Sequence, residues 1–147
     1  MNSSCVYLAQ TDTTVGFLSS DDKKLSSIKQ RESTQKTLQV VDSFKTLNQF
    51  TRVPKKMRKL VRNSKRTTFI YPNGYAFRVV DKNSPHNLFI KKFKCLYSTS
   101  ANITKQNFDE HYASKYSNII IYNKGGFSQT ISSSIVKLTN LKSKIIR

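Results

Sequence analysis

The chain has 147 residues, 37% of them hydrophobic, which fits one domain built around one core. Its 26 Lys and Arg against 8 Asp and Glu give a formal net charge of +18, which favours polyanionic partners such as nucleotides or nucleic acid. Two Cys without CxxC spacing and two His argue against a disulfide framework, a zinc site and a His-based triad. No stretch has the length and hydropathy of a membrane span and no signal peptide is evident, so we expect a cytoplasmic protein without membrane contact.

The N-terminal part of the sequence predicts a strand, a helix and a second strand. Cys5–Ala9 is a short apolar run that ends in a Thr/Asp-rich turn, as in a strand followed by a loop. From Ser20 to Gln30 the apolar residues share one helical face, and Ser20 or Asp21 can cap the first turn. Thr37–Val41 is the second predicted strand.

A dense group of cations follows, with no Asp or Glu between Asp42 and Asp81. Pro54 suits a first helical turn, and the next residues predict a helix, Pro54–Arg62, with a narrow apolar stripe. That stripe contains no Trp or Phe, which argues against a membrane-binding helix. The cations of this segment are Arg52, Lys55, Lys56, Arg58, Lys59, Arg62, Lys65 and Arg66.

The C-terminal half alternates between strand and helix patterns. Thr67–Tyr71 and Tyr75–Val80, joined by Pro-Asn-Gly, predict a hairpin. The further predictions are helices at Pro85–Lys92 and Asp109–Tyr116 and strands at Lys94–Tyr97, Ile119–Tyr122 (buried) and Ser134–Leu138 (the last strand). Helices mixed irregularly with strands around a hairpin indicate an α/β domain with a mixed sheet.

Several short polar patterns are suited to binding phosphate. Lys29 and Arg31 are expected at the end of the first helix, where both cations can reach one phosphate group. Ser98–Asn102 is predicted to form a loop after a strand, and such loops can hold phosphate or ribose oxygens. Thr11–Thr14 before Gly16 and the serines Ser132–Ser134 offer further hydroxyl groups. The sequence contains no Walker A loop and no GxGxxG.

The order of these motifs along the chain resembles the YrdC-like family, the threonylcarbamoyl-AMP synthases. The motif that carries most of the resemblance is Ser98-Thr99-Ser100-Ala101-Asn102, and the others gain weight from their order. In chain order the matching segments are Thr11-Asp12-Thr13, Ile28-Lys29-Gln30-Arg31, Thr68-Phe69-Ile70, Arg78-Val79, Ser98-Thr99-Ser100-Ala101-Asn102 and Ser133-Ser134-Ile135-Val136.

The resemblance implies a single YrdC-like domain over residues 1–147, with a twisted mixed sheet and a basic concave cleft. It implies that ATP, accompanied by Mg²⁺, reacts there with L-threonine and bicarbonate to give threonylcarbamoyl-AMP and pyrophosphate. That product serves the threonylcarbamoyl modification of adenosine 37 in tRNA, so other proteins of this modification would be partners.

The resemblance also implies roles for individual residues. Lys29 and Arg31 would be catalytic and would neutralise the triphosphate and the developing pyrophosphate. The other residues implied for ATP or phosphate are Ser100, Asn102 and Ser133, and those implied for threonine or carbamate are Thr13 and Arg78. No protein-bound metal is implied.

An alternative function rests on departures from the family pattern. Gln10 replaces a proline, Val15 replaces a tyrosine, Lys137 replaces an acid, and the chain is short for the family. Together with the cations of Arg52–Arg66, these departures support a catalytically weak YrdC-like module that binds RNA or nucleotide.

Overall fold

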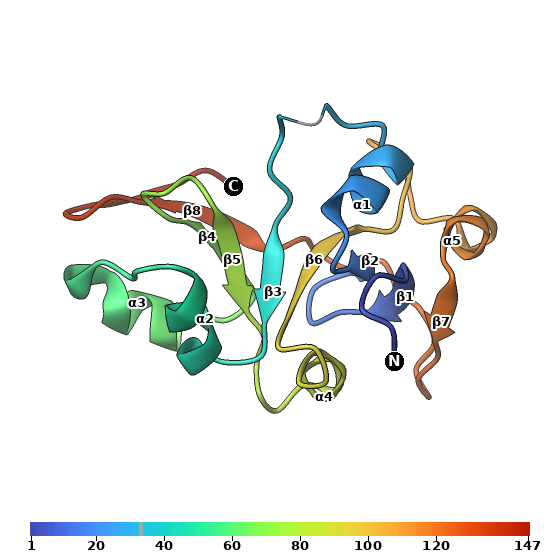
Figure 1. Cartoon of the computed structure of the whole chain (residues 1–147), viewed down its shortest axis with the longest axis horizontal. Coiled ribbons are helices and arrows are strands. Elements are labelled where there is room, and N and C mark those ends of the chain that lie inside the picture. The colour runs from blue at the N-terminus through green and yellow to red at the C-terminus, as the bar shows by residue number, and fades with distance from the viewer. Residues whose placement is uncertain (33) are drawn as a thin grey trace.

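A computed structural model describes residues 1–32 and 34–147 of the chain. The described residues form one mixed nine-stranded sheet in the order β7-β1-β2-β6-β3-β5-β4-β8-β9 (Figure 1). The strands are β1 Tyr7–Gln10, β2 Val15–Ser19, β3 Gln39–Val41, β4 Thr67–Ile70, β5 Ala76–Val79, β6 Cys95–Ser100, β7 Ile119–Ile121, β8 Ser134–Leu138 and β9 Ser143–Ile145. The helices are α1 Asp22–Ile28, α2 Phe44–Phe50, the 3-10 turn η1 Lys55–Met57, α3 Arg58–Asn63, α4 Pro85–Ile90 and α5 Glu110–Tyr116. The predicted α/β class with a mixed sheet is confirmed.

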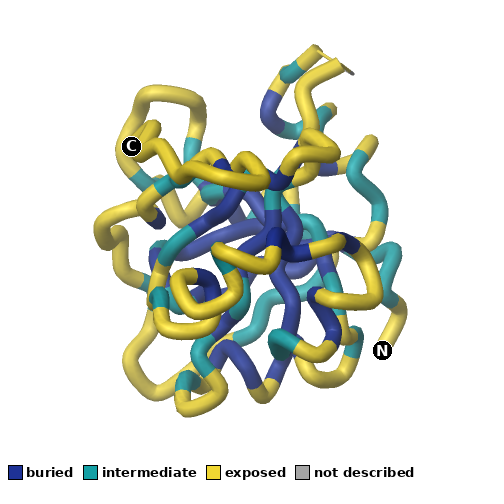
Figure 2. Tube along the Cα trace, turned by 90° about the vertical axis from the view of Figure 1, so that its left-hand side faces the viewer, coloured by how far each residue is buried: buried dark blue, intermediate teal, exposed yellow. Residues whose placement is uncertain are grey.

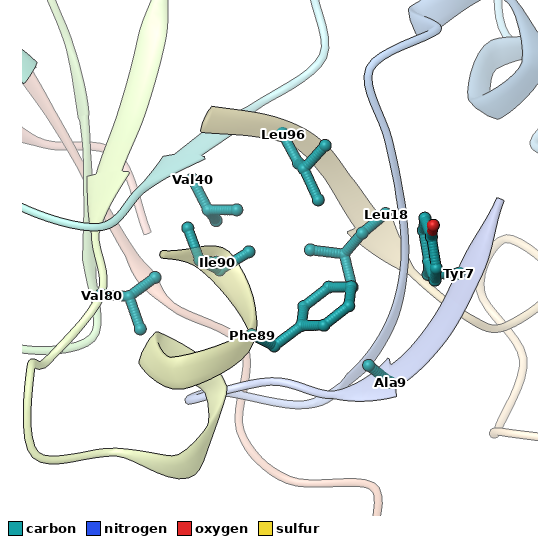
Figure 3. Packing of buried hydrophobic residues seen from close by; sticks show 8 residues of the cluster. All are labelled: Tyr7, Ala9, Leu18, Val40, Val80, Phe89, Ile90 and Leu96. Carbon is teal, nitrogen blue, oxygen red and sulfur yellow. The ribbon is translucent and has the colours of Figure 1, made fainter. Parts of the chain in front are cut away.

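One face of the sheet is covered in part by α4. Phe89 and Ile90 of this helix pack against Val40, Leu96 and residues of β1 and β2 (Figure 3). These residues alternate along their strands with residues of the other face, because successive side chains of a strand point to opposite sides. The helix covers only part of its face, and the uncovered part is available for a site.

The opposite face is covered by two separate groups of helices. Leu25 of α1 and Ala113 of α5 pack against Phe17 and its neighbours in β1 and β2. Leu47 of α2 and Val61 of α3 pack against β3, β4 and β5. Figure 2 shows the resulting buried interior, surrounded by exposed chain. Within the described residues, no helix has the length and apolar character needed to cross a membrane.

The local sequence signals that predicted the helix starts are present in the structure. The Asp21 carboxylate accepts a hydrogen bond from the Lys24 backbone N–H, and Ser84 accepts one from Asn87. Both are N-caps, which satisfy backbone donors that the first helical turn leaves free. The predicted hairpin is also confirmed, since β4 and β5 pair antiparallel.

Some elements differ from the prediction because tertiary pairing decides them. The predicted loop Ser98–Asn102 is strand as far as Ser100, because Ser98–Ser100 pair with β2, itself not predicted. The predicted buried strand Ile119–Tyr122 is the half-buried edge strand β7, which pairs with β1. Ser134–Leu138 is followed by one more strand, β9, and α2 was not predicted.

Gly16 lies where the turn after β1 approaches β6. A Cβ atom at this position would stand 3.0 Å from the Thr99 carbonyl oxygen and 3.2 Å from Cγ2 of Thr11. The first of these neighbours is backbone of a paired strand and cannot move away freely. The absence of a side chain at Gly16 therefore permits β2 to lie close to both β6 and the turn after β1.

We expect Gly16→Ala to lower the free energy of unfolding by about 1–3 kcal/mol, the usual cost of overpacking. Gly125→Ala is the control, because its Cβ would meet only Asn123 Oδ1, at 3.7 Å. Urea unfolding monitored by circular dichroism gives the free energy of unfolding of both variants. Equal stability of the two variants would contradict the role assigned to Gly16.

Candidate functional site

A cavity of about 400 Å³ lies beside the part of the sheet face that α4 covers. Its described lining contains four cationic side chains and no carboxylate. The cations are Arg31, Lys36, Arg78 and Arg147, and the hydroxyl residues are Thr11, Thr13, Thr14, Thr68, Ser98, Thr99, Ser100, Ser132 and Ser133. This combination of positive charge and small donors suits an anion with several oxygens, such as a polyphosphate.

The turn between β1 and β2 is held by its own threonines. The Thr11 hydroxyl donates to the Thr14 carbonyl oxygen at 2.5 Å, and the Thr13 N–H donates to the Thr11 hydroxyl at 3.1 Å. These bonds satisfy backbone groups inside a tight turn. They fix Thr13, which is almost fully buried, at the wall of the cavity.

Helix α1 ends in a Schellman motif, which determines where its two C-terminal cations lie. Gln30 has a φ of 52°, its N–H bonds to the Ser27 carbonyl, and the Arg31 N–H bonds to the Ser26 carbonyl. Glycine is the usual residue at this left-handed position. The motif reverses the chain directly after Lys29, so that Lys29 and Arg31 leave the helix in different directions.

Lys29 contacts the end of β6 and does not line the cavity. Its ammonium donates to the Ser100 carbonyl at 3.1 Å, to Asn102 Oδ1 at 3.2 Å and to the Asn102 carbonyl. Burial and, secondly, the nearby charge of Arg31 lower the pKa of Lys29 to about 8. Lys29 thus connects the end of α1 to Ser100 and Asn102.

Arg31 does line the cavity. One of its terminal nitrogens, Nη2, donates to the Thr99 hydroxyl at 3.2 Å. Burial lowers its pKa, and the charge of Asp22 opposes that effect. A guanidinium keeps its charge under such conditions and offers several donors, so Arg31 can still bind an anion.

A buried ion pair closes the floor of the cavity. The Arg78 guanidinium, 3% exposed, donates to Asp12 Oδ1 at 3.0 Å, and Asp12 is 5% exposed. Burial lowers the pKa of Arg78, whereas the carboxylate of Asp12 raises it. Among the described residues, Arg78 Nε and Asp12 Oδ2 are buried and have no hydrogen-bond partner.

His86 of α4 lies buried near this pair, and neither of its ring nitrogens has a partner within the described residues. Burial is the main cause that lowers its pKa to about 4. The imidazole is therefore neutral at physiological pH.

Among residues 1–32 and 34–147, no three His, Cys, Asp or Glu side chains are grouped as metal ligands.

The structure adds two cations, Arg147 and Lys36, to the cavity residues that the sequence analysis singled out. Arg147 donates from Nε and Nη2 to the Ser133 carbonyl, at 3.1 and 2.7 Å. The Thr68 and Ser133 hydroxyls lie 2.8 Å apart. The Lys36 ammonium lies 3.9 Å from the centre of the Tyr75 ring, a cation–π contact at the edge of the cavity. Arg147 and Lys36 are isolated cations in the sequence, and only the fold brings them here.

The predicted site residues fall into two groups. Thr13, Arg31, Arg78, Ser100 and Ser133 line the cavity. The others, Lys29 and Asn102, bond to each other behind the cavity wall, and Asn102 lines a smaller adjoining cavity of about 70 Å³. The structure thus brings five of the seven predicted residues to one cavity, whereas the chemical role of each residue stays a prediction.

Comparison with known proteins identifies the family of this chain. A family model for Sua5, YciO and YrdC proteins, described as "Telomere recombination", matches residues 6–147. The chain belongs to this family. Comparison with curated proteins finds no significant match.

Solved structures of the Sua5/YciO/YrdC family share the fold at low sequence identity. Two structures of Sua5 from P. abyssi, the second complexed with L-threonine, match with TM-scores of 0.78 and 0.77 at 17% and 16% identity. They cover 98% of this chain, which spans 52% and 50% of the two Sua5 chains. E. coli YciO matches with a TM-score of 0.76 at 14% identity over 98% of this chain and 82% of its own. The chain thus spans about half the length of Sua5.

We expect Asp12→Ala to destabilise the fold by about 3–5 kcal/mol, because it leaves the Arg78 charge buried without a partner. The double variant Asp12→Ala/Arg78→Met lacks both charges of the pair, so we expect it to be more stable than Asp12→Ala alone. Urea unfolding of the double-mutant cycle measures the coupling. Strictly additive losses would show that the ion pair does not couple the two residues.

Proposed function

We propose that the cavity binds ATP by its triphosphate and forms threonylcarbamoyl-AMP from ATP, L-threonine and bicarbonate. The observation that carries this proposal is the convergence of Arg31, Lys36, Arg78 and Arg147 on a cavity whose described lining contains no carboxylate. Membership of the Sua5/YciO/YrdC family, which includes enzymes, and the fold shared with a threonine-bound Sua5 support the choice of substrates. The product would serve threonylcarbamoylation of adenosine 37 in tRNA, together with other proteins of that modification.

The chemistry can be written without a covalent enzyme intermediate. The threonine amine adds to bicarbonate with loss of water to give a carbamate. A carbamate oxygen then attacks the α-phosphorus of ATP, a P–O bond forms, and the bond to the leaving pyrophosphate breaks. Such a transfer needs alignment of its reactants and neutralisation of developing negative charge, which fixed cations and hydroxyls supply.

Each part of the cavity has a role in this proposal. Arg31, with Lys36 and Arg147, contacts the phosphates that leave as pyrophosphate. Ser100 and Ser133 donate hydrogen bonds to phosphate or ribose oxygens. Lys29 and Asn102 hold the end of β6 in place, and Lys29 adds its charge from behind the wall.

The threonine portion fits the floor of the cavity. The charge of Arg78 attracts a carboxylate or carbamate oxygen, and Thr13 lines the same cavity. Mg²⁺ enters with ATP as part of the substrate. The described lining contains no carboxylate, so phosphate oxygens rather than this chain would hold the ion.

The test of this proposal is pyrophosphate release from Mg-ATP by the purified chain. We expect release only when both threonine and bicarbonate are present. Arg31→Ala should lower kcat/KM by a factor of about 100 or more, the usual loss for one transition-state donor. Arg58→Ala, which removes an exposed arginine of α3 outside the cavity, is the control. Pyrophosphate release that does not depend on threonine or on bicarbonate would disprove the proposed reaction.

A second test uses the pKa of Lys29. Because this pKa falls from 10.5 to about 8, the ammonium is charged at neutral pH and loses its proton as the pH rises through that value. The affinity for ADP should therefore fall more in the wild type than in Lys29→Arg between about pH 7 and about pH 9. Isothermal titration calorimetry gives the ADP affinity of both proteins at each pH. A change in the charge of ADP with pH affects both proteins equally, so the difference between them reports on Lys29. Identical pH profiles would remove Lys29 from the phosphate site.

A further inference from the structure

A second hollow in the protein surface is larger than the cavity described above. It has a volume of about 540 Å³, against about 400 Å³ for the cavity. It is bordered by the start of α2, the end of α3 and the turn from β5 to α4. We call it the α2–α3 pocket; the lining residues that matter for its chemistry are the apolar Phe44, Val61 and Val79 and the cationic Lys45, Arg62 and Lys82.

The floor of the α2–α3 pocket is apolar and belongs to the core. Val61 is buried, and Phe44 and Val79 pack against the same cluster of core residues. Side chains in such a cluster hold fixed positions, because protein interiors are close-packed. The floor is therefore preformed, and an apolar ligand group can lie on it without rearrangement of the core.

The two carboxylates that line the pocket already have partners within the protein. Asp42 Oδ1 accepts hydrogen bonds from two hydroxyls, and its Oδ2 lies 3.4 Å from the Lys94 ammonium. Asp81 Oδ1 accepts from a backbone N–H of its own turn at 3.0 Å, and its Oδ2 pairs with Lys65 at 3.2 Å. A cationic or zwitterionic ligand would have to displace these donors, which disfavours such a ligand.

Three cations that line the pocket, Lys45, Arg62 and Lys82, have no carboxylate partner among the described residues. All three are exposed, and the ion pairs within residues 1–32 and 34–147 involve other side chains. The Arg62 guanidinium lies over the Phe44 ring, with its central carbon 4.7 Å from the ring centre. This cation–π contact holds one positive charge directly beside the apolar floor.

The pocket and the cavity lie on opposite faces of the sheet. Phe77 and Val79 of β5 pack beneath α2 and α3, whereas Arg78 between them lines the cavity. Side chains alternate between the two faces of a strand, so the sheet separates the two sites. No described residue lines both of them. A ligand in the pocket therefore leaves the cavity open.

We propose that the α2–α3 pocket binds a small organic monoanion, an aromatic or branched aliphatic group that carries one carboxylate. The apolar group lies on the floor, and the carboxylate meets the cations that have no partner. An apolar surface with a few placed polar groups is the usual composition of a small-molecule site of this size. The inference goes beyond the proposed function and does not depend on it.

A polyphosphate fits the pocket less well than it fits the cavity. The cavity offers many hydroxyl groups, whereas two serines line the pocket and both already donate within the protein. Ser43 donates to the Asp42 carboxylate at 3.2 Å. Ser64 donates to the Leu60 carbonyl at 2.7 Å. The two carboxylates of the pocket also repel a multiply charged anion more than a single charge.

The test uses anilinonaphthalene sulfonate, an aromatic monoanion whose fluorescence rises in apolar surroundings, and phenylacetate as its competitor. Two double variants are compared with the wild type, and each lowers the net charge of +18 by two. The pocket variant is Lys45→Gln/Lys82→Gln. The control variant is Lys23→Gln/Lys124→Gln, which removes exposed lysines outside the pocket. Titration at physiological salt gives each Kd, and thermal unfolding checks that both variants fold.

We expect the wild type to bind the probe saturably and to release it to phenylacetate with a Kd below about 1 mM. The pocket variant should raise both Kd values by a factor of about 5, because two exposed charge contacts are lost. The control variant should leave both values nearly unchanged. Equal weakening in the two variants, or a phenylacetate Kd above this limit, would overturn the proposal.

Two further competitors test the class of ligand. Benzyl alcohol has the ring without the charge, and inorganic phosphate has the charge without the ring, so neither should match phenylacetate. Equal displacement by benzyl alcohol would overturn the choice of an anion. Displacement by phosphate or by ATP would show that the probe is bound by charge alone or in the cavity, and the pocket would be rejected. Because pyrophosphate release is not measured in this test, the inference and the proposed function can fail separately.

Discussion

The buried ion pair between Arg78 and Asp12 is the contact on which the cavity depends. Arg78 comes from β5, and Asp12 comes from the turn between β1 and β2. The two halves of the sheet that hold these segments are joined by a short pairing of β3 with β6, which involves Gln39–Val41. The ion pair adds a second connection across the cavity floor. The Asp12 carboxylate also allows the Arg78 guanidinium to stay buried, because burying an unpaired charge costs much more free energy.

The large positive charge of the chain is distributed to two places with different surroundings. In the cavity, Arg78 is buried and Arg31 is half-buried, and they are held by bonds to Asp12 and to the Thr99 hydroxyl. On η1 and α3 the cations are exposed, and one of them, Arg62, lies over the Phe44 ring. The first arrangement fixes donors for one compact anion, whereas the second leaves its charges at the surface. The sheet between them allows both to coexist.

The match to Sua5 and YciO structures at 14–17% identity indicates how little of this fold depends on particular side chains. A core tolerates many apolar sequences if volume and patterning are kept. Constraints at the site are narrower, since Gly16 must lack a side chain and the end of α1 must turn sharply after Lys29.

The sequence by itself determined the fold class, the β4–β5 hairpin and the capped helices α1 and α4, because turn residues, caps and hydrophobic periodicity act within a few positions. Five residues that line the cavity, Thr13, Arg31, Arg78, Ser100 and Ser133, were predicted from the resemblance of ordered motifs to a family. Only the tertiary structure decided that Ser98–Ser100 is strand, that Lys29 lies behind the wall, and that Arg147 and Lys36 reach the cavity. Such features arise from contacts between distant segments, as with Arg78 and Asp12, 66 positions apart. The physical reason is that pairing and burial, not local propensity, set their energies.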